Sequence, residues 1–556
     1  MIRKALWAFV GVALFAGCQS DSQLSGVDTT AQPLLTLDNP AAAAFLSDGQ
    51  IPVSGEAEAL TDVTVNGQPA TLSTGGYAST TTLTRGVNIV EARGTDELGN
   101  HLFVRHGVLA GQYGNASQPI DNALDLRVNK GGLRDILDAA SDMLTPQTVA
   151  DQISNPVYTT SYDVQGTTVA DLSASVTQIG FDRLSIEVTP MDGELYISVW
   201  VPNLYVGLEA AGSAIGIDYS TDATLWADRV ELGGYATVDA QNGHLVVGWD
   251  RSAVNLIGFG YNIDFVPDQI EQATVIDGVM QIVDRLLADQ LDQQLPSLLE
   301  QQLSQLGIDF QTDVQGKTLT VHGDFASASV DPDGIALGLD LDVNMPGSTH
   351  GAPGYLTAPA GTPTLDASSD LSVALSDDLL NRTMFEAWGA KLLDMQLSTD
   401  DGSLDPHMLT PLGASQGTIK TRADLPPVIV QKDHGLQMQI GELDVQVDTP
   451  DGDLGTHLDA AVAVYANLNL SVHNGTLRLD IGTPDLVMQV RDSDWGASDE
   501  ATTALLEQML PIDSLMSLLG SIQLPLPSLG GLTVQQASVT RDPSGVSTGV
   551  DITLGR

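Results

Sequence analysis

A pattern that occurs twice constrains the fold of this chain more than any other feature. A short apolar strand runs directly into an amphipathic helix at Leu124–Leu144, and the same order returns at Leu371–Leu393. Strand-like segments follow each copy, and a second apolar helix closes it, near Ala273–Leu306 and near Ala501–Leu519. Repeated order at long spacing indicates two copies of one large unit. We therefore expect an α+β fold in which two elongated units, each a strongly curved β-barrel-like sheet with two helices along it, are joined by a central sheet.

The helices of these units have recognisable stripes and breaks. Their Leu, Ile and Met residues recur at the three- and four-residue spacing of one helix face. Pro146 should end the first helix, Pro296 should kink or interrupt the second, and Pro511 should divide the last. A stripe of this kind usually packs in a core. In a curved sheet with few aromatic residues, however, two helices also leave a long aliphatic groove.

The N-terminus reads as an export signal. Arg3 and Lys4 precede the apolar stretch Ala5–Gly17, which is too short to span a bilayer as a permanent helix. Phe15-Ala16-Gly17-Cys18 then resembles a bacterial lipobox, with Phe15 where Leu is usual. We expect residues 1–17 to be a lipoprotein signal peptide and residues 18–32 a flexible tether. An ordinary cleavage site followed by a chance cysteine is the alternative.

Cys18 is the only cysteine of the chain, so no intrachain disulfide can form and Cys18 is the predicted lipid anchor. Gln19 follows it, and by the sorting rule known for enteric bacteria the absence of Asp there implies the outer membrane. We therefore expect a bacterial outer-membrane lipoprotein, on the periplasmic or the cell-surface face.

The charge excludes one class of partner. A net charge of −49 over 556 residues repels nucleic acid and anionic lipid headgroups, so we expect no nucleic-acid partner. Solubility, or life in a salty habitat, accounts for such a charge without a cationic partner.

Residues 33–110 read as a small all-β module. A strand enters the Asn66-Gly67 turn, Leu83–Arg93 alternates like a strand, and Asp96–Asn100 is another turn. These segments resemble the bacterial immunoglobulin-like module typified by glucodextranase domain B. Such modules usually serve as spacers. Sugar binding is an alternative with little support, because Tyr77 and Phe103 are as suited to a core as to a surface.

Three segments of the remaining chain resemble the bactericidal/permeability-increasing protein and lipid-transfer family, of the tubular lipid-binding superfamily. They are Leu124–Ala140, with a strand, a Lys-Gly turn and a helix; Val373–Leu397, with an acidic helix start and Gly389 before a strand; and the tail Leu526–Leu554. The resemblance implies a first barrel over 120–309, a central connecting sheet over 310–370, and a second barrel over 371–556 whose tail returns to that sheet.

In that family each barrel holds a lipid between its sheet and its helices, so the resemblance implies a lipid partner here. Two departures matter: no cysteine is available for the disulfide of the animal members, and the first barrel is acidic where endotoxin-binding members are basic. Methionines on the stripes suit ligands of variable shape. The candidate lipid-binding residues are Leu133, Ile136, Leu137, Ala140, Met143, Ile282, Leu286, Leu379, Met384, Phe385, Trp388, Leu505 and Met509.

We expect a membrane-anchored protein that sequesters or transfers lipid, with no cofactor, no metal and no enzymatic activity. The main alternative is a structural or adhesive surface protein without a ligand. An esterase would need Ser415, which lies in a formal G-x-S-x-G match at residues 413–417, but Pro411 and a strand-like segment flank it instead of a strand and a helix. Acidic turns such as Asp331–Gly334 could hold Ca²⁺, although turn formation alone accounts for them.

Overall fold

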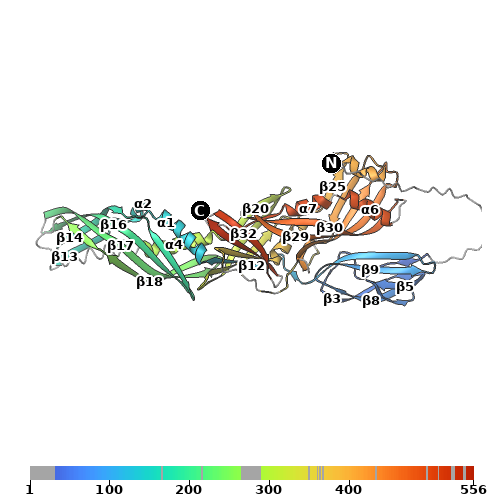
Figure 1. The fold of residues 1–556 in the computed structure, drawn as a ribbon, viewed down its shortest axis with the longest axis horizontal. Helices are drawn as coiled ribbons and strands as arrows, with labels where there is room; N and C mark the ends of the chain where they lie inside the picture. The colour runs from blue at the N-terminus through green and yellow to red at the C-terminus, as the bar shows by residue number, and fades with distance from the viewer. Residues whose placement is uncertain are drawn as a thin grey trace, which may run out of the picture.

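The protein is described from a computed structural model and is elongated (Figure 1). The first unit occupies one end, a sheet occupies the middle, and the second unit lies beside the N-terminal module at the other end. Cys18, Ile282 and Leu286 fall outside the described residues, as do the side chains of Ala140 and Met143. The structure describes residues 32–164, 167–214, 217–264, 290–347, 351–359, 361, 365, 368–432, 435–495, 499–510, 512–527, 533–542 and 546–555.

The central sheet is antiparallel and has the order β20-β21-β22-β12-β24-β33-β32. Its two middle strands are the repeated strands of the sequence pattern, paired so that Leu126 lies opposite Val373. Because each strand leads into a helix and the two strands are antiparallel, the two helices leave the sheet in opposite directions. The strands are β12 (Ile120–Asn129), β20 (Asp309–Val314), β21 (Lys317–Asp331), β22 (Gly334–Asn344), β24 (Leu371–Ser376), β32 (Thr533–Arg541) and β33 (Ser547–Gly555).

The sheet of the first unit is a curled half-barrel. Its strand order, β13-β14-β16-β17-β18 with β15 on β16 and β19 on β17, is an open path within the described residues. The expected barrel is therefore not closed by strands: α1 packs on β15 and α4 on β18, and the two helices contact each other. Their apolar side chains fill the place of closing strands. The strands are β13 (Tyr158–Val164), β14 (Thr167–Gly180), β15 (Ser185–Met191), β16 (Glu194–Ala214), β17 (Ile217–Gln241), β18 (His244–Ile257) and β19 (Gly260–Ile263).

Among the described residues, three helices accompany this sheet. They are α1 (Lys130–Met143), α2 (Pro146–Gln152) and α4 (Gln290–Ser304). Pro146 begins α2 after α1 has ended, as predicted. Pro296 lies inside α4 and does not interrupt it, contrary to one of the two outcomes expected for it.

The second unit repeats the arrangement with the order β25-β26-β28-β29-β30-β31 and β27 on β28. One helix ends at Met509 and the next begins at Ile512, so the closing helix is divided at residue 511, as Pro511 predicted. The first helix ends at Gly389, so Leu392 and Leu393 lie in the following turn instead of on the helix. The elements are α5 (Asp377–Gly389), β25 (Met395–Ser398), the 3₁₀ helix η2 (Pro406–Leu412), β26 (Thr418–Ala423), β27 (Val428–Lys432), β28 (Gly435–Asp448), β29 (His457–His473), β30 (Thr476–Ser493), α6 (Asp499–Met509), α7 (Ile512–Gly520) and β31 (Gln523–Pro525).

The N-terminal module is all β. The predicted hairpin at Asn66-Gly67 is confirmed, since both residues have positive φ (46° and 76°) and join β5 to β6. A short pair, β11 (Tyr113–Gly114) and β23 (Tyr355–Leu356), follows the module. The module's strands are β1 (Leu34–Leu35), β2 (Phe45–Leu46), β3 (Gly49–Gly55), β4 (Ala57–Glu58), β5 (Leu60–Val65), β6 (Gln68–Pro69), β7 (Thr71–Ser73), β8 (Gly76–Leu83), β9 (Gly86–Asp96) and β10 (His101–Ala110).

This module packs against the second unit. Gln439 Oε1 on β28 accepts a hydrogen bond of 2.7 Å from the Val87 backbone N–H, and Arg105 Nη1 donates to the Met488 carbonyl at 2.8 Å. A separate apolar cluster that includes Val87 and Leu109 of the module and Val430 of β27 lies in the contact. The module is therefore docked on the outer face of the second sheet instead of projecting as an isolated spacer.

One apolar interior runs through both units. A single cluster of buried side chains extends from β12 and the first sheet, through the central sheet, to α6, α7 and the second sheet. Burial of this surface supplies stability in a chain that can form no intrachain disulfide. In the part of the chain that the structure describes, none of the helices is both long and apolar enough to cross a membrane.

Candidate functional site

The strongest candidate site is a groove between α7 and β30, at the edge of the second sheet. It has a volume of about 650 Å³, within the range of small-molecule sites. We call it the α7–β30 groove. Its lining residues are Leu479, Asp480, Ile481, Gly482, Thr483, Pro484, Met516, Ser517, Gly520 and Ser521.

The local sequence explains how this groove forms. Leu477, Leu479 and Ile481 alternate along β30 and turn toward the interior. The pairing of β29 with β30 then shifts register between Ala466 and Leu468, near Gly482, so the strand edge departs from regular alternation. The irregular edge and the helix end leave space between them.

The groove is bounded at one end by a close approach. A Cβ on Gly520, at the end of α7, would lie 3.2 Å from the Leu479 carbonyl oxygen, a tight contact, so glycine suits this close approach of helix and strand. Beyond it, β31 pairs with residues 476–478 of β30, and the Leu526 N–H donates to the Gly475 carbonyl at 2.9 Å. These bonds fix the helix end relative to the strand.

The groove is amphipathic. Leu479 and Met516 are buried and Ile481 is half-buried, so the floor is apolar and belongs to the continuous interior. Ser517 and Thr483 are exposed at the rim, together with Asp480. An apolar floor under a hydroxyl- and carboxylate-bearing rim suits a ligand with a hydrocarbon part and a polar end. The Asp480 carboxylate favours an end that is neutral or cationic.

The predicted residues of the first unit lie in a packed core. Leu133, Ile136 and Leu137 are buried on α1, against β15 and β12. The unit also has an opening of about 550 Å³ over β13, β14 and β16. Among the described residues that line it, most are small or carry a hydroxyl group and Leu172 is the only large apolar one, so the opening is less suited to hydrocarbon. Its lining residues are Thr159, Thr160, Ser161, Asp171, Leu172, Ser173, Ala211 and Gly212.

The predicted residues on α5 are also enclosed. Leu379, Met384 and Phe385 are buried, and Trp388 is half-buried with its Nε1 donating to the Ala423 carbonyl at 2.6 Å. This helix packs against β22, β23, β27 and β12, where the central and second sheets meet. Its apolar stripe thus lies at a structural junction.

Polar bonds lock α5 in place. Arg382 Nη2 donates to the Val343 carbonyl at 3.0 Å and lies 3.1 Å from Glu386 Oε1. Burial raises the pKa of Glu386, and Arg382 opposes that rise. Asn381 both accepts from the Ile429 N–H at 2.6 Å and donates to the Ile429 carbonyl at 3.1 Å. Moving α5 to admit a ligand would break these buried hydrogen bonds, so this helix is unsuited to opening a ligand site.

The predicted residues on α6 do not line the groove, but their helix packs against the same strand. Met509 is buried and Leu505 is half-buried, and α6, like α7, packs against β30. Sequence reasoning did not select the strand residues Leu479 and Ile481 or the rim residue Ser517. The signal that could have found them is the break Gly482-Thr483-Pro484 in an otherwise alternating strand.

Ser415 is not on a nucleophile elbow. It follows η2, which ends at Gly413 with φ 67°, and precedes β26, whereas the elbow needs a strand before and a helix after. Ser415 Oγ donates to Asp451 Oδ2 at 2.6 Å, and hydrogen bonds from Ser415 and the Gln416 N–H hold the pKa of Asp451 below its ordinary value. The Ser415 hydroxyl therefore stabilises the local loop structure through its bond to Asp451.

The carboxylates of the acidic turns accept hydrogen bonds from other residues of the chain. Asp331 accepts from Arg127 and from the backbone N–H groups of Asp333 and Gly334, and these bonds lower its pKa. Asp401 similarly accepts from Ser403. Within the described ranges, no three His, Cys, Asp or Glu side chains gather as metal ligands.

No family model matches the chain, and no curated protein matches it. Among solved structures, the crystal structure of lipopolysaccharide binding protein is similar over 78 % of this chain and 99 % of that chain, with 12 % sequence identity and a TM-score of 0.42.

Proposed function

We propose that this protein binds a lipid, holding its acyl part in the α7–β30 groove and its polar end at the rim. The observation that carries the proposal is an opening of about 650 Å³ whose floor, Leu479 and Met516, is part of the apolar interior. Sequestration of this kind needs no catalytic residue. Burying about ten methylene groups contributes roughly 8 kcal/mol before ordering costs are subtracted.

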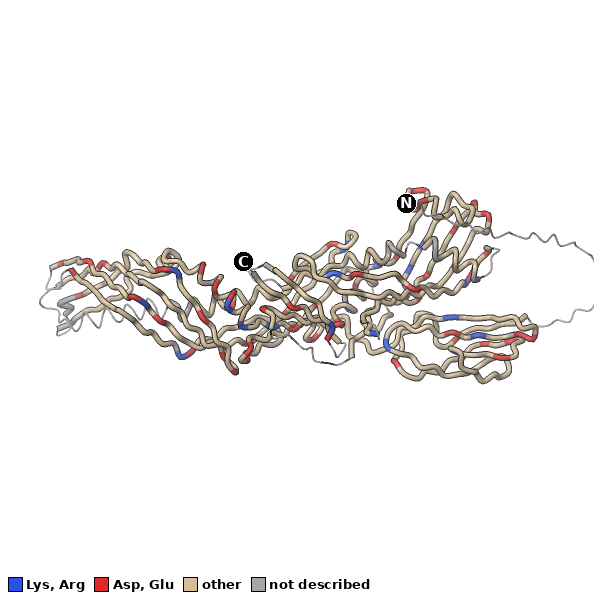
Figure 2. The backbone as a smooth tube through the Cα atoms, in the orientation of Figure 1, with Lys and Arg blue, Asp and Glu red and all other residues tan. Residues whose placement is uncertain are grey.

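The electrostatics select among lipids. Acidic side chains are spread over the whole molecule, whereas Lys and Arg are few (Figure 2). Asp480 adds a carboxylate at the rim of the groove itself. A neutral, zwitterionic or cationic polar end is therefore favoured over an anionic one, and binding of anionic vesicles should be weak and should improve as salt screens the repulsion.

We also propose that acyl chains on Cys18 anchor the protein to the bacterial outer membrane, on its periplasmic or cell-surface face. The support is the sequence alone: the lipobox-like residues 15–18 and Gln19 after the cysteine. Cys18→Ser should release the protein from the membrane fraction or leave it as an unprocessed precursor. A mature-sized variant that still sediments with membranes would contradict the anchor.

The groove is tested by filling it. Ser517 is exposed and lines the groove, and Ser514, one turn earlier on α7, is exposed and does not line it. Ser517→Trp should reduce the lipid recovered per mole of purified protein at least about fivefold, while the matched control Ser514→Trp should leave it unchanged. Organic extraction followed by mass spectrometry gives the stoichiometry, and circular dichroism verifies that both variants are folded.

The packing of α1 and α5 favours one alternative, a structural surface protein without a ligand. Buried side chains on these helices, such as Ile136 and Met384, are what a filled core requires. If wild-type protein purified from its own host carries no lipid, or if Ser517→Trp retains full stoichiometry, the structural role replaces lipid binding.

A further inference from the structure

The outer face of the first unit carries a row of exposed aromatic side chains. In the part of the chain that the structure describes, the most exposed aromatic residues are Trp226 (41 %), Tyr205 (38 %) and Tyr196 (37 %). All three lie on β16 or β17, the long strands of the first unit (Figure 1). The three most exposed aromatic side chains of the described residues therefore lie on one surface, in a chain that has few aromatic residues.

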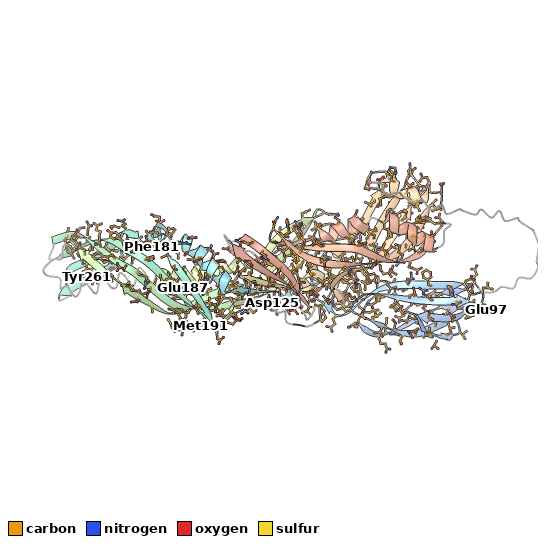
Figure 3. The ribbon with its side chains drawn as sticks, viewed as in Figure 1. Glu97, Asp125, Phe181, Glu187, Met191 and Tyr261 are labelled. Carbon is orange, nitrogen blue, oxygen red and sulfur yellow. The ribbon has the colours of Figure 1, made fainter. Side chains whose placement is uncertain are left out.

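Strand register aligns these rings. Tyr196 lies opposite Tyr235, Trp200 lies opposite Glu231, and Tyr205 lies opposite Trp226. We call the five aromatic residues of these pairs the aromatic row. At about 3.3 Å per residue, the row from Tyr196 to Tyr205 extends roughly 30 Å along the hairpin. Its neighbour Tyr261 on β19 instead pairs with Leu225 and packs against the interior, at the far end of the unit (Figure 3).

Glycines let the rings lie flat. A Cβ on Gly233 would meet the Tyr196 ring and hydroxyl, at 2.7 Å from the hydroxyl oxygen, and a Cβ on Gly260 would meet the Trp226 indole at 2.5 Å. Each ring therefore covers the backbone of the next strand instead of standing away from it. Tyr196 and Tyr235 are close, with ring centroids 5.2 Å apart. The result is a flat surface on which the Tyr196 and Trp226 rings cover the strands beneath them.

The two arginines beside the row are paired with acidic side chains. Arg251 forms an ion pair with Glu194 and lies over the Tyr235 ring at 3.9 Å, and Arg229 lies 2.6 Å from Glu231. Asn255 also donates to Glu231 at 3.2 Å. Both arginines are thus neutralised by their partners, and Glu187 on β15 and Asp228 on β17 are further exposed carboxylates. The surroundings of the row therefore do not favour an anionic polymer, and they offer hydrogen-bond donors and acceptors.

We propose that the aromatic row binds a neutral glycan chain. The C–H faces of pyranose rings stack on flat aromatic rings, and their hydroxyls bond to paired polar side chains such as Glu231, Arg229 and Asn255. A linear row matches a linear polymer. A bilayer surface fits less well, because membrane-interface aromatics are accompanied by lysines and arginines that attract headgroups, and here the cations are neutralised by their partners.

The test uses the full protein and three soluble neutral polysaccharides: dextran, hydroxyethyl cellulose and galactomannan. Affinity gel electrophoresis should show retarded migration of the wild type with at least one of them. Tyr205→Ser/Trp226→Ser should weaken that retardation roughly tenfold. Val246→Ser removes an exposed apolar side chain from the neighbouring strand β18 and should behave as the wild type.

A second variant guards against misfolding, because Trp226 covers Gly260. Tyr205→Ser alone should reduce retardation by a smaller factor with unchanged circular dichroism. The proposal is overturned if none of the three polysaccharides retards the wild type, or if the double variant migrates as the wild type does. It is also overturned if the double variant instead loses binding to phosphatidylcholine vesicles or loses self-association in gel filtration, since the row would then contact a bilayer or a second copy.

Discussion

The ion pair between Asp377 and Arg541 should be among the most sensitive points of the structure. Asp377 is in the first turn of α5, and its side chain is 0 % exposed. Arg541, at the end of β32, is 21 % exposed and donates to both carboxylate oxygens, at 2.6 and 2.5 Å. The pair therefore ties the C-terminal hairpin to the helix that joins the central and second sheets.

Arg541→Met would leave the Asp377 carboxylate buried without its cation. Removing one partner of a buried pair costs about 3–5 kcal/mol, because the remaining charge is not solvated. At 1.4 kcal/mol per factor of ten, amide exchange of α5 should accelerate by roughly 10² to 4 × 10³, provided that exchange follows the opening equilibrium. Hydrogen exchange with mass spectrometry over residues 377–389 measures this directly.

Two controls separate the buried charge from the loss of packing. Asp377→Leu/Arg541→Met removes both charges and should return most of the protection. Arg93→Met breaks a pair with Glu91 in which the arginine is 60 % exposed, and it should change exchange in its own strand by less than about fivefold. Exchange of α5 within twofold of the wild type in Arg541→Met would refute the argument.

Three further predictions concern packing, pH and a turn. Ile136→Ala should lower the free energy of unfolding by about 2–5 kcal/mol, seen in a denaturant titration, because Ile136 is buried in the α1 core. Burial raises the pKa of Glu442, whose carboxylate accepts from the Gly107 N–H, so its contribution to stability is present below the ordinary carboxyl pKa and is lost as pH rises through the raised one. Glu442→Gln lacks this titrating group, so only the wild type loses stability in this way as pH rises. The melting temperature of the variant minus that of the wild type should therefore increase from pH 5 to pH 8, and a constant difference would contradict this. Gly67→Ala should destabilise the N-terminal module by about 1 kcal/mol, measured by exchange in β5, because Gly67 has φ 76° and open space around it.

Sequence patterns that span a few residues predicted the structural features that span a few residues. The strand-into-helix repeat, the Asn66-Gly67 hairpin and the division of the last helix all follow from spacing and turn chemistry within a few residues. The pairing of the two repeated strands with each other is a long-range fact, and no property of Leu126 or Val373 alone reveals it.

Periodicity does not distinguish a core from a groove. The stripe on α5 and the residues of the α7–β30 groove carry the same apolar signal, but Met384 is packed while Met516 borders open space. What separates them is the packing around each helix. That packing depends on contacts such as Gly520 against Leu479 and on the pairing of β31, which join residues that are not adjacent in sequence.

The aromatic row shows the same limit at a single residue. Along β16, even-numbered residues such as Tyr196 are the more exposed before Asn203, and odd-numbered residues such as Tyr205 are exposed after it. Asn203 has φ 53° and reverses the alternation. Uniform alternation from Tyr196 onward would place Tyr205 inside, so the row is visible only once this irregularity is known.

The architecture sets the two proposed sites apart. Because β12 and β24 are antiparallel neighbours, the units extend in opposite directions, with the aromatic row on the first and the groove on the second. Leu34 pairs with Glu58, and Leu60 pairs with Asp96, so the described chain begins toward the Glu97 end of the module, beside the second unit (Figure 3). Residues 18–31 can span at most about 50 Å. An anchor at Cys18 would therefore attach the molecule at the end opposite the first unit and its aromatic row, with α7 and the groove lying between the two (Figure 1).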